Sequence, residues 1–355
     1  MVGAFPPPIH GMSVVNNTIR ERFFVNEIYP SVINLSATSL NRKLLKRFSR
    51  FSYVILGILR FTYLLLRRKV QPLYLSISGG LGQIYEIGFV ALARLFGIRI
   101  FIHHHSYAYL ERLNHITYLL LRIAGEKATH VALSDDMAIK LEMFYPNIRD
   151  IMVISNVAMI GKKNQEFLSA NRSIKKIGFI GNISREKGIL DFFDVVDNIE
   201  SQGLNLKALI AGPFQDSGIE MAVKKRLTLL RNAEYIGPKY GSGKKEFFKE
   251  IDVLLFPTRY FNEAEPLIIH EAMQQGIPVI SFAKGSIAEI IPSNSGLVVA
   301  KDANFVDAAV QQLKDWQSHP NKFLNASINA RKHFIEMKSI YDKRFEILYE
   351  RILAS

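Results

Sequence analysis

Two carboxylates eight positions apart, Glu263 and Glu271, are the residues of this chain best placed to do chemistry. Glu263 belongs to a polar loop that follows Ile251–Pro257, an apolar run typical of a buried parallel strand. Glu271 belongs to the helix predicted after Pro266, whose other positions are mostly apolar. A carboxylate in such surroundings is rarely buried without a partner, and the hydroxyl groups of a sugar are suitable partners.

The helix that carries Glu271, predicted from Pro266 to Gly276, offers a second kind of binding group. Its first amides, around Pro266, Leu267 and Ile268, have no acceptor inside the helix, so they can bind a diphosphate. The next predicted strand, 277–281, places the loop at the sheet edge where open α/β sheets bind ligands. The pattern suits a nucleotide sugar, but two solvated surface glutamates would show the same spacing.

Length and composition limit the possible classes of protein. With 355 residues and 48% hydrophobic residues, the chain should form about two domains with real cores. It has no cysteine, which excludes disulfides, thiol catalysis and thiolate metal sites and is consistent with the cytoplasm. No signal peptide is predicted, because no charged region precedes an apolar stretch at the N-terminus. The net charge of +13 calls for an anionic partner.

Most of the positive charge lies in residues 1–69, which contain eleven Lys and Arg against two Glu. A helix over residues 40–69 would gather five of the cations on one arc, and six apolar side chains would lie opposite. This arrangement is typical of a helix on an anionic membrane surface. The cations are Arg42, Lys43, Lys46, Arg47 and Arg50, and the apolar residues are Leu44, Leu45, Phe48, Phe51, Ile55 and Leu59.

The same pattern has three other interpretations. The helix could pack its apolar side on its own sheet and leave a solvated basic side. A transmembrane helix is rejected, because the apolar span 51–66 is short and contains Arg60. Nucleic acid is not expected as a partner, since no recognised binding motif accompanies the charge.

Strands and helices alternate along the whole chain, with a polar stretch at 161–173 between two series. The pattern predicts an α/β protein with two doubly wound, Rossmann-like domains that face a central cleft. The expected domains are 1–160, joined by a C-terminal helix at about 338–355, and 161–337. The predicted strands are 2–5, 31–35, 73–78, 98–102, 131–134, 152–156, 176–181, 206–211, 233–236, 251–257 and 277–281.

Five blocks of sequence carry a resemblance to a known family, and the similarity extends over nearly all of the chain. They are Pro7–Gly11, Ser155–Val157, Gly181–Gly188, the Glu263/Glu271 segment with Gly276–Val279, and the final segment 340–353. In this order and spacing the chain resembles the retaining GT-B glycosyltransferases of family 4, also described as glycosyl transferases group 1. In this fold, the final segment would be the helix that crosses back to the first domain.

The resemblance implies a role for each matching residue. Glu263 would lie near the hydroxyls and reacting face of the donor sugar, and Glu271 would bind ribose hydroxyls. Lys187 would neutralise the leaving diphosphate, together with the amides around Leu267. The family has arginine where this chain has Asn182, and Arg185 is the nearby cation that could compensate.

The family also has a histidine at the end of a central strand of the first domain, facing the donor sugar. His105 is the favoured match and His103 the second, and both should share one face because side chains alternate along a strand. Gly11 is expected to allow close approach to the substrates, whereas His10 could be structural. No metal site is predicted, because three consecutive histidines do not converge on one ion.

These inferences predict a metal-independent glycosyltransferase that needs no cofactor, since its nucleotide sugar is a substrate. UDP is expected as the nucleotide, a membrane-associated saccharide as the acceptor, and the inner face of the cell membrane as the location. A polyprenyl diphosphate is expected to carry this acceptor, in the assembly of a cell-surface polysaccharide. A soluble acceptor and a non-catalytic binding or scaffold subunit of the same fold are the alternatives.

Overall fold

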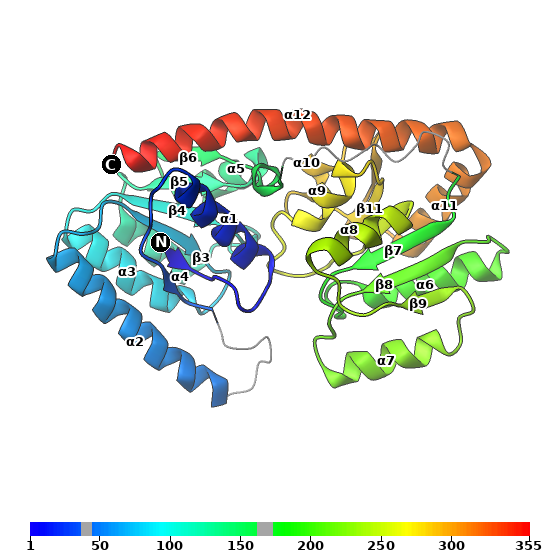
Figure 1. The fold of residues 1–355 in the computed structure, drawn as a ribbon, viewed down its shortest axis with the longest axis horizontal. Coiled ribbons are helices and arrows are strands. Elements are labelled where there is room, and N and C mark those ends of the chain that lie inside the picture. The colour runs from blue at the N-terminus through cyan, green and yellow to red at the C-terminus, as the bar shows by residue number, and fades with distance from the viewer. Residues whose placement is uncertain (37–44, 162–172) are drawn as a thin grey trace. The chain divides into compact units, whose positions relative to one another are not determined.

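The computed structural model describes residues 1–36, 45–161 and 173–355, with the backbone alone for residues 45–51. The chain divides into two compact units (Figure 1). The first comprises Met1–Met159 with Ile340–Ser355, and the second comprises Ile160–Ser339. Each unit is built on a parallel sheet of six strands flanked by helices, so the predicted α/β fold class is confirmed.

The sheet of the first unit has the strand order β2-β1-β3-β4-β5-β6. The strand order reverses between β1 and β3, and ligands of doubly wound sheets bind at such a switch point. The strands are β1 (Val2–Gly3), β2 (Ile33–Asn34), β3 (Leu73–Ile77), β4 (Ile100–His104), β5 (Thr129–Ala132) and β6 (Asp150–Val153). The helices are α1 (Gly11–Val25), α2 (Leu45–Leu66), α3 (Gln83–Leu95), α4 (His115–Ala124) and α5 (Asp135–Phe144), and a short 3-10 helix, Asn156–Met159, follows β6.

The sheet of the second unit has the order β12-β11-β10-β7-β8-β9, with its switch point between β7 and β10. The strands are β7 (Lys176–Ile180), β8 (Lys207–Ala211), β9 (Ala233–Tyr235), β10 (Val253–Phe256), β11 (Val279–Phe282) and β12 (Gly296–Val299). The helices are α6 (Ile189–Ser201), α7 (Ser217–Leu227), α8 (Gly241–Glu250), α9 (Leu267–Gln274), α10 (Ile287–Ile290), α11 (Phe305–Ser318) and the long α12 (Pro320–Leu353).

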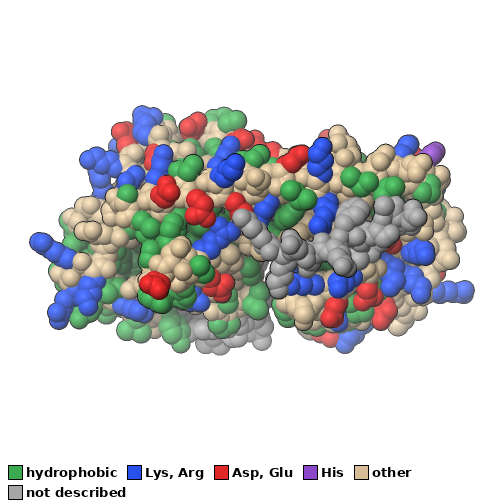
Figure 2. Space-filling view, turned by 45° about the horizontal axis from the view of Figure 1, so that its top comes forward, with side chains coloured by type: hydrophobic (Ala, Val, Ile, Leu, Met, Phe, Trp, Pro, Cys, Tyr) green, Lys and Arg blue, Asp and Glu red, His purple; other side chains and the backbone are tan. Residues whose placement is uncertain are grey.

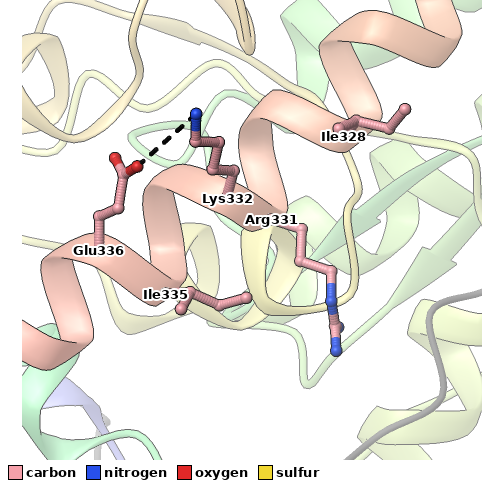
Figure 3. Close-up of a pocket in the computed structure, with 5 residues that line it drawn as sticks. All are labelled: Ile328, Arg331, Lys332, Ile335 and Glu336. Carbon is pink, nitrogen blue, oxygen red and sulfur yellow. Dashed lines mark ion pairs between the residues drawn. The ribbon is translucent and has the colours of Figure 1, made fainter.

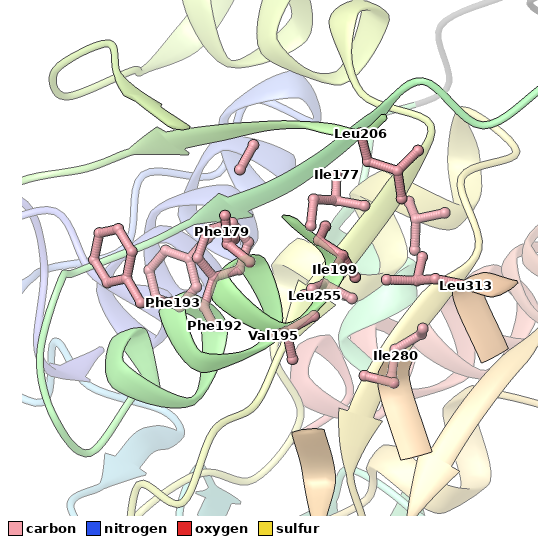
Figure 4. Close-up of a cluster of buried hydrophobic side chains, with 14 of the residues drawn as sticks. Ile177, Phe179, Phe192, Phe193, Val195, Ile199, Leu206, Leu255, Ile280 and Leu313 are labelled. Atoms are coloured by element: carbon pink, nitrogen blue, oxygen red, sulfur yellow. The ribbon is translucent and has the colours of Figure 1, made fainter. Parts of the chain in front are cut away.

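The core of the second unit lies between its sheet and helices α6 and α11 (Figure 4). Ile177 and Phe179 alternate along β7 toward this side and meet Phe192 of α6 and Leu313 of α11. All four side chains are fully buried. Burying one such side chain contributes about 1.5–3 kcal/mol, so this cluster fixes the strands whose ends form the candidate site.

Helix α12 has 34 residues, and its part from Ile340 onward belongs to the first unit. There Phe345 and Tyr349 are buried, and the Tyr349 ring lies 4.9 Å from the ring of Phe23 on α1. Arg22 of α1 stacks on the Phe345 ring at 4.4 Å and pairs with Asp342 at 3.6 Å. The helix predicted for residues 340–353 is confirmed, and aromatic packing attaches it to α1.

Helix α2 buries a different side from the one that the predicted packing on its own sheet would bury. Its buried side chains are Val54, Phe61 and Leu65, whereas Ile55 and Leu59, expected on a packed or membrane-facing side, are exposed. The prediction that the helix could bury this apolar side on its own sheet is therefore wrong for these two residues. Arg42, Lys43 and Leu44 lie outside the described residues, as does most of the predicted linker, and for Lys46, Arg47 and Arg50 only the backbone is described.

The surface shows scattered charge on the face drawn in Figure 2. There, Lys and Arg side chains lie among acidic and hydrophobic ones. Within the described ranges, no helix has the length and apolar character needed to cross a membrane.

Candidate functional site

The loops that follow β7 and β10 meet at the switch point of the second unit. The amide of Arg259 donates to the carbonyl of Glu186 at 2.8 Å, which ties the two loops together. Gly188 has a φ of +81°, and a Cβ at this position would lie 2.0 Å from the carbonyl oxygen of Pro257. Only glycine permits this close approach, and the approach brings residues 182–187 beside residues 258–266.

Glu263 and Lys187 form an ion pair across these two loops. The same carboxylate oxygen accepts a hydrogen bond from the Thr258 hydroxyl at 2.9 Å. The Lys187 ammonium also lies over the rings of Phe256, at 5.4 Å, and Tyr260, at 4.9 Å. Because Glu263 is buried and Lys187 largely so, their charges act in a poorly solvated setting, where electrostatic interactions are stronger than in water.

The loop around Glu263 is held by backbone contacts to the segment after β11. Gly285 has a φ of +58°, and a Cβ there would lie 2.3 Å from the carbonyl oxygen of Ala264. The amide of Ser286 donates to the same oxygen at 2.8 Å. Glu265, which follows, is buried and hydrogen-bonded to the buried His270 of α9 at 2.8 Å. These contacts give the Glu263 carboxylate a fixed position before any ligand arrives.

Helix α9 begins at Leu267, immediately after Pro266, and no side chain caps its N-terminus. Leu267 and Ile268 are half-buried, so their amides are available to an anion at the helix end. Glu271 lies one turn further along and pairs with Lys244 of α8. Lys244 is not among the residues predicted for the site, and its position after Gly241–Gly243 at a helix start is the only sequence signal that marks it.

The positions predicted to help hold the diphosphate differ in their surroundings. Asn182 is half-buried beside Gly181, whereas Arg185 is exposed and forms no ion pair with the part of the chain described here. The structure therefore brings Lys187 and Glu263 into contact but leaves Arg185 in solvent. Glu271 pairs with a different cation, Lys244, which is not among the residues predicted for the site.

The histidines of the first unit lie at the end of β4, which extends through His104 and not only to Ile102 as predicted. The rings of His103 and His105 lie 4.0 Å apart, so the expectation that they share a face is confirmed. His104 points the other way, with Nδ1 3.0 Å from the Tyr109 hydroxyl and Nε2 3.0 Å from Nδ1 of His130. Within the described ranges, no three His, Cys, Asp or Glu side chains are grouped so as to hold a metal ion.

Tyr74 fixes the protonation pattern of the buried His103. The Tyr74 hydroxyl lies within hydrogen-bonding distance of Nδ1 of this ring. Burial raises the pKa of Tyr74, so its hydroxyl keeps a proton that must be donated, and Nδ1 is its acceptor. The proton of neutral His103 is then on Nε2, which has no partner among the described residues. Nε2 of His105 likewise has none, and both Nε2 atoms are buried.

His10 and Gly11 lie at the start of α1, after β1. His10 caps this helix reciprocally with Ser13, whose amide donates to its ring and whose hydroxyl accepts from its amide. His10 is therefore a structural residue, and it lies close enough to His105 to lower the pKa of that ring. A Cβ on Gly11 would meet no described atom within 4 Å, so the backbone at the helix start is open to approach.

Acid is expected to destabilise the first unit through these histidines. Burial lowers the pKa of His105 to about 3 and that of His130 to about 4, the latter despite the opposing charge of Asp150. Burial and the neighbouring rings also lower the pKa values of His103 and His104. Below pH 6.5, these histidines bind protons in the unfolded chain but stay neutral in the folded chain until the pH approaches their lowered pKa values. Stability is therefore complete above pH 6.5 and falls by about 1.4 kcal/mol per pH unit for each such histidine.

Hydrogen exchange of peptides covering β4 and β5, compared at pH 7.5 and pH 5, checks this expectation. Opening of these strands should become easier at pH 5, whereas peptides from β7 and β10 should change little. The substitution His130→Gln should reduce the difference. Equal opening free energies of β4 and β5 at both pH values would contradict the argument.

A separate hollow lies on helix α12 in the second unit (Figure 3). It has a volume of about 410 Å³ and is lined by Ile328, Arg331, Lys332, Ile335 and Glu336. Lys332 pairs with Glu336 at 4.0 Å along the same helix face. None of the predicted site residues lines it, and it is a shallow feature of one helix surface.

Comparison with known proteins adds family and fold information to this geometry. Residues 162–333 match the family described as glycosyl transferases group 1. The chain is 28% identical over 126 residues to the capsular polysaccharide biosynthesis glycosyltransferase CapM of Staphylococcus aureus. This match covers 35% of the chain and about a third of CapM (32%).

Two solved structures share the fold over nearly their whole length. Sucrose-phosphate synthase from Thermosynechococcus elongatus gives a TM-score of 0.70 at 14% identity, covering 99% of each chain. Anabaena HepE in complex with UDP gives 0.70 at 14% identity, covering 98% of this chain and 99% of HepE. The chain thus has the fold of GT-B glycosyltransferases, and residues 162–333 match the glycosyl transferases group 1 family.

Proposed function

We propose that the chain is a glycosyltransferase that uses a nucleotide-diphosphate sugar. One observation carries this proposal: two carboxylate–lysine pairs, Glu263 with Lys187 and Glu271 with Lys244, lie beside the free amides of α9. The carboxylates suit the hydroxyls of the sugar and the ribose, and the amides suit the diphosphate. The match of residues 162–333 to glycosyl transferases group 1 supports this assignment. UDP is the nucleotide we propose, because HepE was solved with UDP and with UDP-glucose.

In the proposed reaction, the bond between the anomeric carbon and the diphosphate oxygen breaks. The acceptor hydroxyl forms the new bond on the same face, so that the configuration is retained as in family 4, and its proton leaves with the diphosphate. Lys187 and the α9 amides stabilise the charge that grows on the leaving diphosphate, and no metal is required. Within the second unit, Glu263 is the residue that we propose for the hydroxyls of the reacting sugar.

A panel of UDP- and GDP-sugars, incubated with the protein and a lipid extract, tests this proposal. Transfer of label to lipid, or slow hydrolysis of one donor, should persist in EDTA. Transfer only to a water-soluble saccharide would identify the soluble-acceptor alternative. Failure to bind any of these donors would contradict the enzyme and favour a scaffold subunit.

We further propose that the acceptor is a membrane-associated saccharide, linked to polyprenyl diphosphate and used in polysaccharide assembly at the inner face of the membrane. The support comes from α2, whose outward face carries Tyr53, Leu56, Leu59, Tyr63 and Leu66, each more than half exposed. Arg60 and Arg67 lie on the same exposed arc, and Arg68 and Lys69 follow the helix. Leucine and tyrosine edged by arginine suit an anionic bilayer surface. CapM, whose name assigns it to capsular polysaccharide biosynthesis, is consistent with such an acceptor.

Changing the exposed face of α2 is expected to release the protein from anionic vesicles. In flotation with phosphatidylglycerol-containing liposomes, Leu56→Ser with Tyr63→Ser should lower the bound fraction at least about threefold, since two anchoring side chains are lost. Changing Lys43, Lys46, Arg47 and Arg50 to Glu should do the same. The matched control is Ile139→Ser with Met143→Ser, which removes two equally exposed residues from α5. Unchanged flotation of both α2 variants would contradict the membrane proposal.

A further inference from the structure

Lys244 stands beside the carboxylate that we assign to the ribose. It lies in the first turns of α8, and its ammonium pairs with Glu271 of α9. The side chains of Lys244 and Glu271 are 29% and 26% exposed. The ammonium is therefore held against the carboxylate in a pair whose two side chains are both partly exposed.

The position of this pair along α9 places Lys244 close to the phosphate end of the site. Glu271 is the fifth residue of the helix that begins at Leu267. At about 1.5 Å per residue, its backbone lies about 6 Å along the axis from the first free amide. A ribose bound at Glu271 and a diphosphate bound at the amides would leave the adjoining phosphate between them, next to the Lys244 ammonium.

The local charges show why a cation is needed there. Lys187 is already paired with Glu263, on the side of the reacting sugar. Asn182 carries no charge, and Arg185 points into solvent without an ion pair to the described residues. A nucleoside diphosphate carries at least two negative charges, and helix amides supply only partial positive charge. Lys244 is the cation that pairs with Glu271, the carboxylate that we assign to the ribose.

We infer that Lys244 binds the phosphate next to the nucleoside, replacing charge that Asn182 does not supply. Without ligand, the Lys244 ammonium pairs with the Glu271 carboxylate. When ribose hydroxyls donate to Glu271, the ammonium uses its remaining donors for the phosphate, since it has three. This inference rests on the proposed function, because it takes a nucleoside diphosphate as the ligand.

Affinities for UDP and for uridine separate the two possible roles of Lys244. UDP is titrated by calorimetry, and uridine is measured by its displacement of UDP. The substitution Lys244→Gln should weaken UDP binding about tenfold or more, because a charge-assisted hydrogen bond to phosphate is lost. Uridine, which has no phosphate, should bind Lys244→Gln as well as the unchanged protein, within about twofold. Lys245→Gln removes the same charge from the neighbouring exposed position and should leave both affinities unchanged.

An equal loss of UDP and uridine affinity would overturn the inference, since Lys244 would then act only by orienting Glu271. Unchanged UDP affinity in Lys244→Gln would overturn it as well. The urea unfolding midpoint of each variant shows whether the fold is kept. If the unchanged protein binds GDP instead, the same comparison applies to GDP and guanosine. If the unchanged protein binds neither UDP nor GDP, the proposed function itself fails. That result differs from one in which the unchanged protein binds UDP and Lys244→Gln binds it equally well.

Discussion

Replacing Glu263 by glutamine is expected to lower turnover by about 100-fold or more while UDP binds as tightly as before, or more tightly. The carboxylate is fixed by Lys187 and Thr258 toward the place where the reacting sugar would lie. A fixed charge that stabilises a developing positive charge contributes on this scale. Glutamine keeps the shape and can still accept from Thr258, so the loop should stay folded. Without its ion pair to Glu263, Lys187 should bind the diphosphate more tightly.

The kinetic signature distinguishes this role from a structural one. Steady-state transfer with the best donor gives kcat and KM, and calorimetry gives the UDP affinity. Lys187→Gln should lower turnover and, unlike Glu263→Gln, also weaken UDP binding about tenfold, because a charge-assisted contact to phosphate is lost. The double variant should be less impaired than the product of the two single effects, since the residues are in contact.

Glu186→Gln is the matched control for this pair of substitutions. Glu186 belongs to the same loop, its side chain is exposed, and only its backbone carbonyl takes part in the loop contacts. Its turnover should stay within about twofold of the unchanged protein, as expected for a surface substitution. Retention of more than a tenth of the turnover in Glu263→Gln would contradict the assigned role.

The fold could be predicted from the sequence because its signals are local. Buried parallel strands such as β7 and β10 are short apolar runs bounded by glycine or proline, and both were placed within two residues. Pro266 marked the start of α9, and Gly276 its end, although the helix itself stops at Gln274. Strand β4 continues to His104, two residues beyond its predicted end, because polar residues such as those at 103–105 do not indicate a buried strand.

The candidate site could be predicted only in part, because its contacts join distant segments. The pairing of Lys187 with Glu263 spans 76 positions, and only the family resemblance linked the two residues in advance. Lys244 resembles any lysine near a helix start, and its pairing with Glu271 depends on how α8 and α9 pack. Helix α2 shows the same limit: both of its sides are apolar, so the sequence did not reveal that Val54, Phe61 and Leu65 would be the packed side.

The tight approach of the two loops in the second unit is expected to depend on Gly188 more than on any other glycine of the candidate site. In Gly188→Ala, the new methyl group would lie 2.0 Å from the Pro257 carbonyl oxygen at a φ of +81°. Strain of this conformation costs about 1–3 kcal/mol, and the overlap with backbone adds about as much. The free energy of unfolding of the second unit should therefore fall by about 3 kcal/mol or more.

Gly203→Ala separates the two causes, because Gly203 has a similar φ of +72° with no described atom within 4 Å of the added Cβ. It should cost only about 1–2 kcal/mol, the penalty of the left-handed backbone alone. The free energies of unfolding of both variants can be measured by urea unfolding, followed by the fluorescence of Trp316. Trp316 is the single tryptophan of the chain and is buried in the core of the second unit. If the two variants unfold at the same urea concentration, the carbonyl contact does not hold the loops. The positions of Lys187 and Glu263 would then need another cause. If Gly188→Ala alone is strongly destabilised, its UDP affinity should fall as well, since the displaced loop carries Lys187 away from the amides of α9.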